Sequence, residues 1–221
     1  MSDDAVGIVL AGGRSERLAG LPVGPGGKAA VVYRGEPLLG RVCHAVAQAV
    51  PKLIVVAAAG QPLPPLPDGS EVIRDSMPAA GPLSALKDGL EHAARSPRPP
   101  RFAFVGSCDL PLLAPQVVRF LLDAARASAA RFVVPMIGGH PQVLTAVVAC
   151  DLAPAIGAVV ARGGGPRRLL DDLAGRQPAA VRLVTAGELA GIDAGLDSFV
   201  DIDTPEDLVR LQTRGFPPSR G

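Results

Sequence analysis

The chain has 221 residues, of which 48% are hydrophobic, 19% are charged and 3% are aromatic, and its formal net charge is +1. A chain this long and apolar buries a sizeable core, which excludes a globally disordered protein. The balanced charge argues against nucleic-acid binding by bulk charge, and the scarcity of aromatic rings argues against a stacking platform for single strands. We therefore expect no nucleic-acid partner.

The cysteines and the apolar runs bear on the cellular compartment. The three cysteines form no C-x-x-C pair, which argues against a disulfide framework or a cysteine-based zinc site. No run approaches eighteen apolar residues, and the acidic start lacks the basic region of a signal peptide. The sequence thus predicts a soluble cytoplasmic protein without a membrane partner.

Strands and helices are predicted to alternate along the first 135 residues. Apolar runs rich in β-branched residues predict strands at 5–11, 53–59, 71–75, 102–106 and 131–135. Helical periods between them predict helices at 37–50, 82–95 and 115–128. Such alternation indicates an α/β fold with a mostly parallel sheet and helices on both of its faces.

The remainder of the chain is less regular. Strands are predicted at 141–149 and 181–185, and helices at 152–161, 166–173 and 205–211. Thr204 is a natural N-cap for the last helix, because Pro205 follows at its first position and Asp207 lies three residues after the cap. Residues 215–221 are expected to be a frayed tail.

A glycine-rich loop with three cations follows the first predicted strand. Gly12 and Gly13 let the backbone approach a phosphate closely, and Arg14, Arg17 and Lys28 supply positive charge. The loop fits neither the P-loop nor the dinucleotide-binding fingerprint, since their glycine and Ser/Thr positions are not matched. This composition suits a polyphosphate, and the alternative is a solvated, merely flexible loop.

Carboxylates at two places in the sequence suit a metal ion. Asp109 comes just after a buried strand, where it can hold Mg²⁺ on a nucleotide, although a turn or helix-capping role is the alternative. Asp201 and Asp203 fall on one face of an extended segment and repel each other unless a cation or donors lie between them. For this pair the alternative is a Thr204 cap flanked by solvated aspartates.

Two further residues lie where a strand gives way to a helix. Asp75 follows the predicted strand at 71–75 and can accept hydrogen bonds from a base or ribose. Gly81 precedes Pro82, which opens a helix beside the same region. A turn aspartate and an ordinary proline at a helix start are the alternative interpretation.

These motifs together resemble a known family. The opening Leu10-Ala11-Gly12-Gly13-Arg14-Ser15-x-Arg17, with Lys28 and Gly35-x-Pro37-Leu38-Leu39, resembles the nucleotidyltransferase superfamily. Gly81-Pro82-Leu83, Cys108-Asp109-x-Pro111, His140-Pro141 and the segment from Asp203 to Leu208 are similar to motifs of the molybdenum cofactor guanylyltransferases. The resemblance extends from residue 6 to about residue 211.

The resemblance implies a fold, an activity and roles for the residues. The implied fold is a single Rossmann-like three-layer domain over residues 1–214, with a mostly parallel mixed sheet. The implied reaction transfers GMP from GTP to the terminal phosphate of molybdopterin and releases pyrophosphate. Its implied partners are these two substrates, with molybdoenzymes or other cofactor-assembly proteins downstream.

The resemblance also implies which residues touch the substrates. Nucleotide contacts are assigned to Leu10, Ala11, Gly12, Gly13, Lys28, Asp75, Gly81 and Asp109. From their charge we also expect Arg14, Arg17 and Lys28 to stabilise the leaving pyrophosphate. The resemblance assigns Mg²⁺ binding to Asp109, and the shared face of Asp201 and Asp203 adds these two residues as further expected ligands.

Two alternative functions remain open from the sequence. The form Asp201-Ile202-Asp203-Thr204-Pro205 is closer to cytidylyltransferases, so the chain is alternatively a cytidylyltransferase or a sugar-phosphate nucleotidyltransferase on the same fold. The lengthened loop before Lys28 and Gly27 in the position of an aspartate motivate a third hypothesis, a non-catalytic nucleotide-binding protein.

Overall fold

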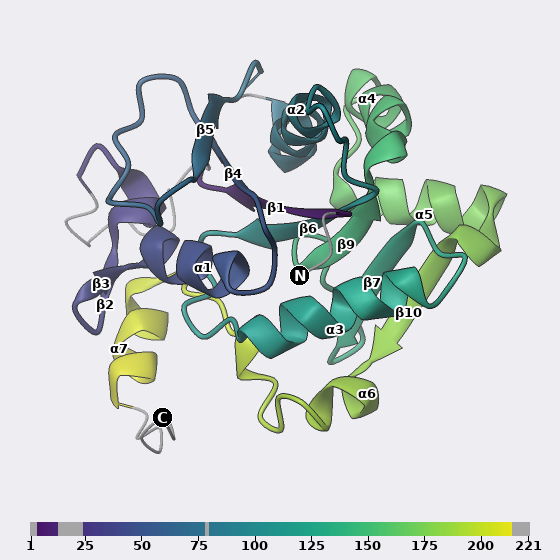
Figure 1. Ribbon diagram of the computed structural model, residues 1–221. Coiled ribbons are helices and arrows are strands. Elements are labelled where there is room, and N and C mark those ends of the chain that lie inside the picture. Colours follow the sequence, from purple (N-terminus) through teal and green to yellow (C-terminus); the bar gives the residue numbers. More distant parts are fainter. Residues whose placement is uncertain (1–3, 13–23, 78–79, 214–221) are drawn as a thin grey trace.

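Helices cover both faces of one large sheet. The structure is a computed structural model that describes residues 4–12, 24–77 and 80–213. Figure 1 shows α2 (Pro82–Ala94) and α4 (Ala153–Ala161) on one face of the sheet and α1 (Leu38–Ala47) and α3 (Pro115–Arg126) on the other. The expected three-layer α/β arrangement is confirmed.

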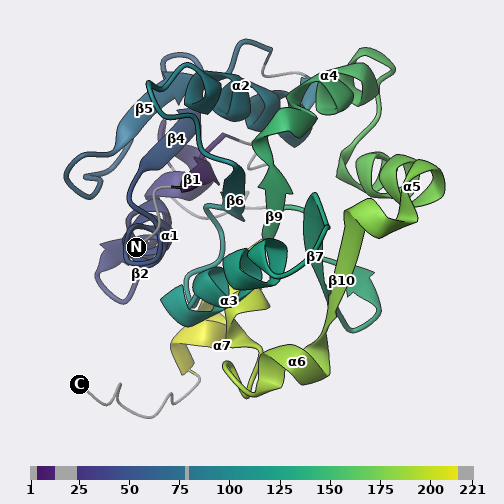
Figure 2. The same cartoon turned by 45° about the vertical axis from the view of Figure 1, so that its right-hand side comes forward.

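The large sheet of the described residues has eight strands in the order β10-β7-β9-β6-β1-β4-β5, with β8 paired to β7. Their bounds are β1 Ala5–Leu10, β4 Leu53–Ala57, β5 Glu71–Arg74, β6 Phe102–Ser107, β7 Phe132–Ile137, β8 His140–Pro141, β9 Ala146–Ala149 and β10 Val181–Thr185. Strand β9 is antiparallel to both neighbours, β6 and β7 (Figure 2), while β1 is parallel to β4 and β6. The sheet is therefore mixed and mostly parallel, as predicted.

Strand β1 lies at the centre of the core. All six of its residues are buried, which is typical of a parallel strand covered on both faces. Helix α2 packs closely on it at Gly89, where an added Cβ would lie 2.8 Å from Ile8 Cγ2. The absence of a side chain at Gly89 therefore allows this helix to approach the central strand.

The predicted helices form, with ends that differ by at most three residues. Beyond the four already named, the structure has α5 Pro166–Arg176, α6 Ala186–Ala190 and α7 Pro205–Thr213. The predicted Thr204 cap of α7 is present, since the Asp207 amide donates to Thr204 Oγ1 at 3.2 Å and Asp207 Oδ2 accepts from the Thr204 amide at 2.9 Å. The short helix α6 was not expected from the sequence.

The single strand predicted over 141–149 is wrong. The chain instead makes a tight hairpin at Gly138 and Gly139, whose φ values of 56° and 79° suit glycine, and β8 pairs back onto β7. A turn closed by the Thr145 amide and the Gln142 carbonyl at 3.1 Å then separates β8 from β9. The apolar run continues through this turn, which is why composition alone suggested one strand.

A small hairpin and a second core were also not expected from the sequence. Strands β2 (Val32–Tyr33) and β3 (Glu36–Pro37) join through Arg34 and Gly35, both at positive φ, in a two-residue turn. The residues that bury this hairpin against α7 are Val31, Tyr33, Leu38, Ile202, Leu208 and Leu211. We call this group the satellite core, and it joins the last helix to the region just after residue 28.

Two of the expected segments lie outside the described residues. These are most of the glycine-rich loop, at residues 13–23, and the tail at 215–221. Within the described part of the chain, none of the helices is long and apolar enough to cross a membrane.

Candidate active site

The candidate site lies at the carboxyl ends of β1 and β6, two neighbouring parallel strands. From β1 the chain proceeds to β4 and β5 on one side, and from β6 it proceeds to β7 and β9 on the other. Ligands of open α/β sheets bind outside the carboxyl ends of strands at such a reversal of strand order. The sheet therefore points to the residues that follow Leu10 and Ser107.

Lys28, Asp109 and Asp203 converge at this place. Lys28 Nζ lies 2.6 Å from Asp109 Oδ2 and 2.5 Å from Asp203 Oδ1. The Lys28 and Asp109 side chains are 16% and 17% exposed, so the contact is largely shielded from water. The lysine that follows β1 and the aspartate that follows β6 therefore form an ion pair at this edge of the sheet.

Short backbone features aim Lys28 and Asp109 at each other. Lys28 lies in a 3-10 helix, Gly27–Ala30, that begins at a glycine with a φ of 61° and is anchored by the buried Ala29. Asp109 follows Cys108, whose amide donates to the Leu10 carbonyl at 3.2 Å and so extends the pairing of β1 and β6 by one residue. Both side chains thus start from well-fixed backbone.

Residues 201–203 reach the site through alternation along an extended segment. Ile202 is fully buried in the satellite core, and its amide donates to the Asp109 carbonyl at 3.0 Å. Asp201 and Asp203 therefore face the other way, as the period of two predicted. The Thr204 cap also forms, so the alternative interpretation is right about the cap, but Asp203 is paired with Lys28 rather than only solvated.

The charges of these groups are strongly coupled. Burial favours the neutral amine of Lys28, but the Asp109 and Asp203 carboxylates outweigh burial and raise its pKa above the ordinary value. Partial burial, together with the Asp203 and Asp109 carboxylates, raises the pKa of Asp201, and Lys28 only partly offsets this effect. The site therefore concentrates negative charge around one ammonium group.

The three carboxylates were predicted to be metal ligands. In the part of the chain that is described, no group of three or more His, Cys, Asp or Glu side chains is arranged to hold a metal ion. Lys28 Nζ lies between two of the three predicted ligands, Asp109 and Asp203. All three side chains offer carboxylate oxygens, which are the donors that Mg²⁺ prefers, so the residues suit the ion chemically.

Asp75 and Gly81 lie along the same edge of the sheet but further from Lys28. Asp75 directly follows β5, three strands away from β6, which corresponds to about 14 Å at the usual strand spacing. Its Oδ1 accepts from the Met77 amide at 2.9 Å, as in the turn that the alternative interpretation anticipated. Gly81 has a φ of 82° and precedes Pro82, the first residue of α2.

The backbone of the predicted nucleotide loop is described only at its ends. Leu10 and Ala11 are buried, and their carbonyl oxygens accept hydrogen bonds from the Cys108 amide and the Gln61 side chain. Gly12 is exposed beyond them. Gly13, Arg14 and Arg17 lie outside the described residues, so their predicted roles stay predictions.

Sequence reasoning missed two side chains that hold the site together. Gln61 Nε2 donates to the carbonyl oxygens of Ala11 and Gly26, each at 3.0 Å. Arg41 Nε donates to the Pro111 carbonyl at 3.1 Å, and its guanidinium lies 5.3 Å from the centroid of the Tyr33 ring. Gln61 comes shortly after a strand at the carboxyl edge, and that position was the one available signal for it.

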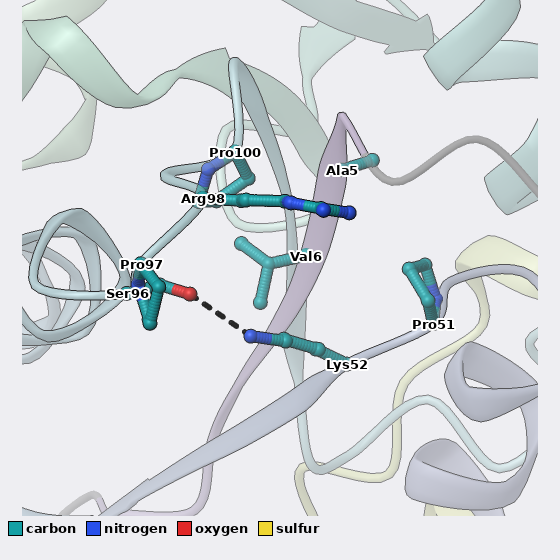
Figure 3. Close-up of a pocket in the computed structure, with 8 residues that line it drawn as sticks. All are labelled: Ala5, Val6, Pro51, Lys52, Ser96, Pro97, Arg98 and Pro100. Atoms are coloured by element: carbon teal, nitrogen blue, oxygen red, sulfur yellow. Dashed lines mark hydrogen bonds between the residues drawn. The ribbon is translucent and has the colours of Figure 1, made fainter.

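A cavity of about 210 Å³ lies elsewhere, at the amino ends of the strands (Figure 3). It is lined by Ala5 and Val6 at the start of β1 and by Lys52, which precedes β4 and donates to Ser96 Oγ at 2.9 Å. Parallel strands carry their ligand sites at the opposite edge. This cavity therefore does not belong to the candidate active site.

Comparison with known proteins identifies the family. Residues 7–180 match the family described as MobA-like NTP transferase domain. The chain belongs to this family. A relative from Mycobacterium avium, named "Probable molybdenum cofactor guanylyltransferase", is 38% identical over 175 residues, which are 77% of this chain and 82% of the relative.

Solved structures of similar fold agree with this family. A crystal structure of molybdopterin-guanine dinucleotide biosynthesis protein A from Archaeoglobus fulgidus has a TM-score of 0.72 at 21% identity, covering 94% of this chain and 96% of that one. A Mycobacterium tuberculosis structure in complex with manganese has a TM-score of 0.63 at 19% identity, covering 95% and 98%. At these identities the likeness shows the shared fold.

Proposed function

We propose that this chain transfers GMP from GTP to the terminal phosphate of molybdopterin and releases pyrophosphate. The observation that carries the proposal is the meeting of Lys28, Asp109 and Asp203 at the carboxyl ends of β1 and β6. Membership of the MobA-like NTP transferase domain family, with a relative at 38% identity that bears the guanylyltransferase name, supports this choice of reaction.

The reaction brings two anions together, so its main requirements are charge neutralisation and alignment. The terminal phosphate of molybdopterin attacks the α-phosphorus of GTP in line with the leaving group. A phosphorus–oxygen bond forms to the acceptor, and the bond between the α-phosphorus and the bridging oxygen breaks, so that pyrophosphate leaves. The attacking phosphate is already ionised, and no general base is required.

Lys28 is suited to neutralise this charge. Its ammonium group is held between two carboxylates and keeps its proton, because they raise its pKa. A positive group near the β- and γ-phosphates lowers the energy of the departing pyrophosphate. Arg14 and Arg17 are proposed to share this role from the segment between Gly12 and Lys28.

Asp109, Asp201 and Asp203 are proposed to hold a divalent cation, Mg²⁺. The ion would supply Lewis-acid stabilisation of the phosphate oxygens when it is bound. Support comes from the oxygen-only donor set and from the manganese named for the M. tuberculosis structure of the same fold. Residues Leu10 to Gly13 are proposed to bind the nucleotide through backbone groups, with Asp75 and Gly81 toward the nucleoside.

The proposed setting is the cytoplasm, where molybdoenzymes or other assembly proteins would take up the dinucleotide product. The three cysteines, Cys43, Cys108 and Cys150, are free, which suits a reducing compartment. The state of the cysteines supports the proposed compartment and does not depend on which reaction the chain catalyses.

The test is pyrophosphate release by the purified chain with Mg²⁺, molybdopterin and each of the four ribonucleoside triphosphates in turn. We expect release with GTP that depends on molybdopterin. Release with CTP instead would favour the cytidylyltransferase alternative, which the sequence Asp201-Ile202-Asp203-Thr204-Pro205 motivates. Nucleotide binding without release under any of these conditions would favour the non-catalytic alternative.

A further inference from the structure

One side-chain amide connects both described ends of the glycine-rich segment. Gln61 Nε2 carries two N–H groups, and it donates to the Ala11 carbonyl and to the Gly26 carbonyl, each at 3.0 Å. Its Oε1 accepts from the Ala58 amide at 3.0 Å. Both donors of the amide and its acceptor therefore hold backbone groups, and the side chain is half-buried.

The backbone around Gln61 is itself fixed by the neighbouring strands. The Gln61 amide donates to the Ala58 carbonyl at 3.1 Å, which closes a turn just after β4. Arg74, the last residue of β5, donates from one guanidinium nitrogen to the carbonyl oxygens of Ala58 and Gln61 at 3.0 and 2.9 Å. The side-chain amide of Gln61 thus extends from a hydrogen-bonded turn toward Ala11, at the end of β1.

The two carbonyls that Gln61 binds have direct connections to the site. Ala11 follows the last residue of β1 and precedes Gly12, where the predicted phosphate-binding backbone starts. Gly26 is the N-cap of the 3-10 helix that carries Lys28. The Gln61 amide therefore fixes the separation between the Gly12 backbone and Lys28.

We propose that Gln61 is a positioning residue for the nucleotide, holding the Gly12 backbone and Lys28 at the spacing that accepts a triphosphate. This inference rests on the proposed function, because it assumes that both elements contact the same ligand. Gln61 does not touch the reacting atoms in this arrangement. Its effect falls on nucleotide binding, through the two backbone segments that it joins.

The chemistry requires an amide at this position. Methionine has nearly the length of glutamine but neither its donors nor its amide oxygen, so Gln61→Met removes both bonds to carbonyl oxygens and the bond from the Ala58 amide without adding charge. Glutamate also lacks the donors, and its carboxylate would face two carbonyl oxygens beside a phosphate site. We therefore expect Gln61→Glu to impair nucleotide binding more than Gln61→Met does.

The experiment measures GTP binding and turnover separately. The dissociation constant for GTP with Mg²⁺ is determined by equilibrium dialysis without acceptor, and kcat and KM are determined from pyrophosphate release. For Gln61→Met we expect Kd and KM to rise about 30-fold, from the loss of two net hydrogen bonds, while kcat changes by less than about threefold. Gln48→Met and Gln48→Glu are the matched controls, since Gln48 is exposed at the end of α1.

Each outcome decides the inference. Unchanged GTP affinity in a folded Gln61→Met variant overturns it, and so does a loss of kcat that follows a lowered thermal unfolding midpoint. If Gln61→Glu fails to fold, the Gln61→Met variant alone decides whether the inference holds. If the unaltered chain binds no triphosphate, the proposed function fails and this inference fails with it. If the unaltered chain binds GTP and releases pyrophosphate, a Gln61→Met variant with unchanged GTP affinity overturns only the role of Gln61.

Discussion

Lys28 and Asp109 are separated by 81 positions in the sequence, yet their side chains form a partly buried ion pair at 2.6 Å. The Lys28 ammonium is shared, because Asp203 pairs with it from the opposite end of the chain. Removing Asp109 therefore leaves Lys28 with a second carboxylate partner. Because Lys28 keeps this partner, a variant without Asp109 can reveal the role of Asp109 in the reaction while the fold is retained.

We predict that Asp109→Ala lowers the rate of pyrophosphate release by about a hundredfold, corresponding to about 3 kcal/mol of transition-state stabilisation. The fold survives because Lys28 keeps its contact with Asp203. The measurement is kcat together with the thermal unfolding midpoint. Asp171→Ala is the control, because Asp171 forms an exposed pair with Arg167 on α5. Full activity of Asp109→Ala would refute the role of this carboxylate.

Arg41 provides a second prediction, because it joins the Tyr33 hairpin to the Asp109 loop through Pro111. Arg41→Ala removes the hydrogen bond to Pro111, a longer ion pair with Glu36 at 3.4 Å and the cation–π contact, and the first and last of these contribute about 1 kcal/mol each. We expect kcat/KM to fall about tenfold, and Arg41→Lys to recover little of it, because lysine lacks the planar fork.

The control for Arg41 is Arg119→Ala. Arg119 also donates to a backbone carbonyl, that of Gln48 at 2.8 Å, but this contact lies between α3 and the end of α1. We expect Arg119→Ala to leave kcat/KM unchanged. Equal losses in both variants would mean that the Arg41 effect is general destabilisation.

Two helical glycines are predicted to respond oppositely to alanine. At Gly89 a new Cβ would lie 2.8 Å from Ile8 Cγ2, so Gly89→Ala forces α2 away from β1 and is expected to destabilise the fold by about 1–3 kcal/mol. At Gly157 in α4 the nearest atom is the flexible end of Lys87 at 3.4 Å, so Gly157→Ala is expected to stabilise by up to about 1 kcal/mol. Urea unfolding of both variants gives the sign, and a neutral Gly89→Ala would contradict the packing argument.

The Glu188 carboxylate gives a pH prediction. It accepts from the Thr185 amide and hydroxyl at 2.8 and 2.9 Å and from Arg182, and these bonds lower the pKa of Glu188 below its ordinary value. A lowered folded pKa means that the stabilisation is present above the ordinary pKa of about 4.3 and is lost as the pH falls through the folded value.

The stability difference between the unaltered chain and Glu188→Gln should therefore be largest near neutral pH and shrink toward low pH. Urea unfolding at a series of pH values measures this difference. Thr185→Ala in the Glu188→Gln background should add little further pH dependence, because Glu188→Gln has already removed the titrating carboxylate. A difference that stays constant with pH would show that the carboxylate charge has no part in it.

The layers of the fold and much of the site's convergence followed from local patterns. Apolar runs and helical periods predicted the strands of the sheet and the helices that cover it. Lys28 and Asp109 both come after predicted strands, and parallel strands end at the same edge of a sheet, which agrees with their contact. The repulsion argument for Asp201 and Asp203 anticipated a nearby cation, and Lys28 meets Asp203. What it did not predict was that a residue of the chain itself supplies that cation.

Other parts of the structure depend on contacts that leave no local pattern. The turn between β8 and β9 interrupts an apolar run without a glycine or proline at the break, so Pro141–Ala149 resembled one strand. Gln61 opens a proline-rich loop without a motif around it, and only the folded chain places its side-chain amide between Ala11 and Gly26. Side chains that hold backbone carbonyls are hard to find in a sequence for this reason.

The satellite core gives the last part of the chain a place in the site. The family match ends at residue 180, before β10, the Asp203 segment and α7. A truncated fragment ending there would retain the strands around β1, but Tyr33 would lose its contact with the Leu211 carbonyl and Lys28 would lose its contact with the Asp203 carboxylate. The minimal unit that could be excised with an intact site therefore reaches at least the end of α7.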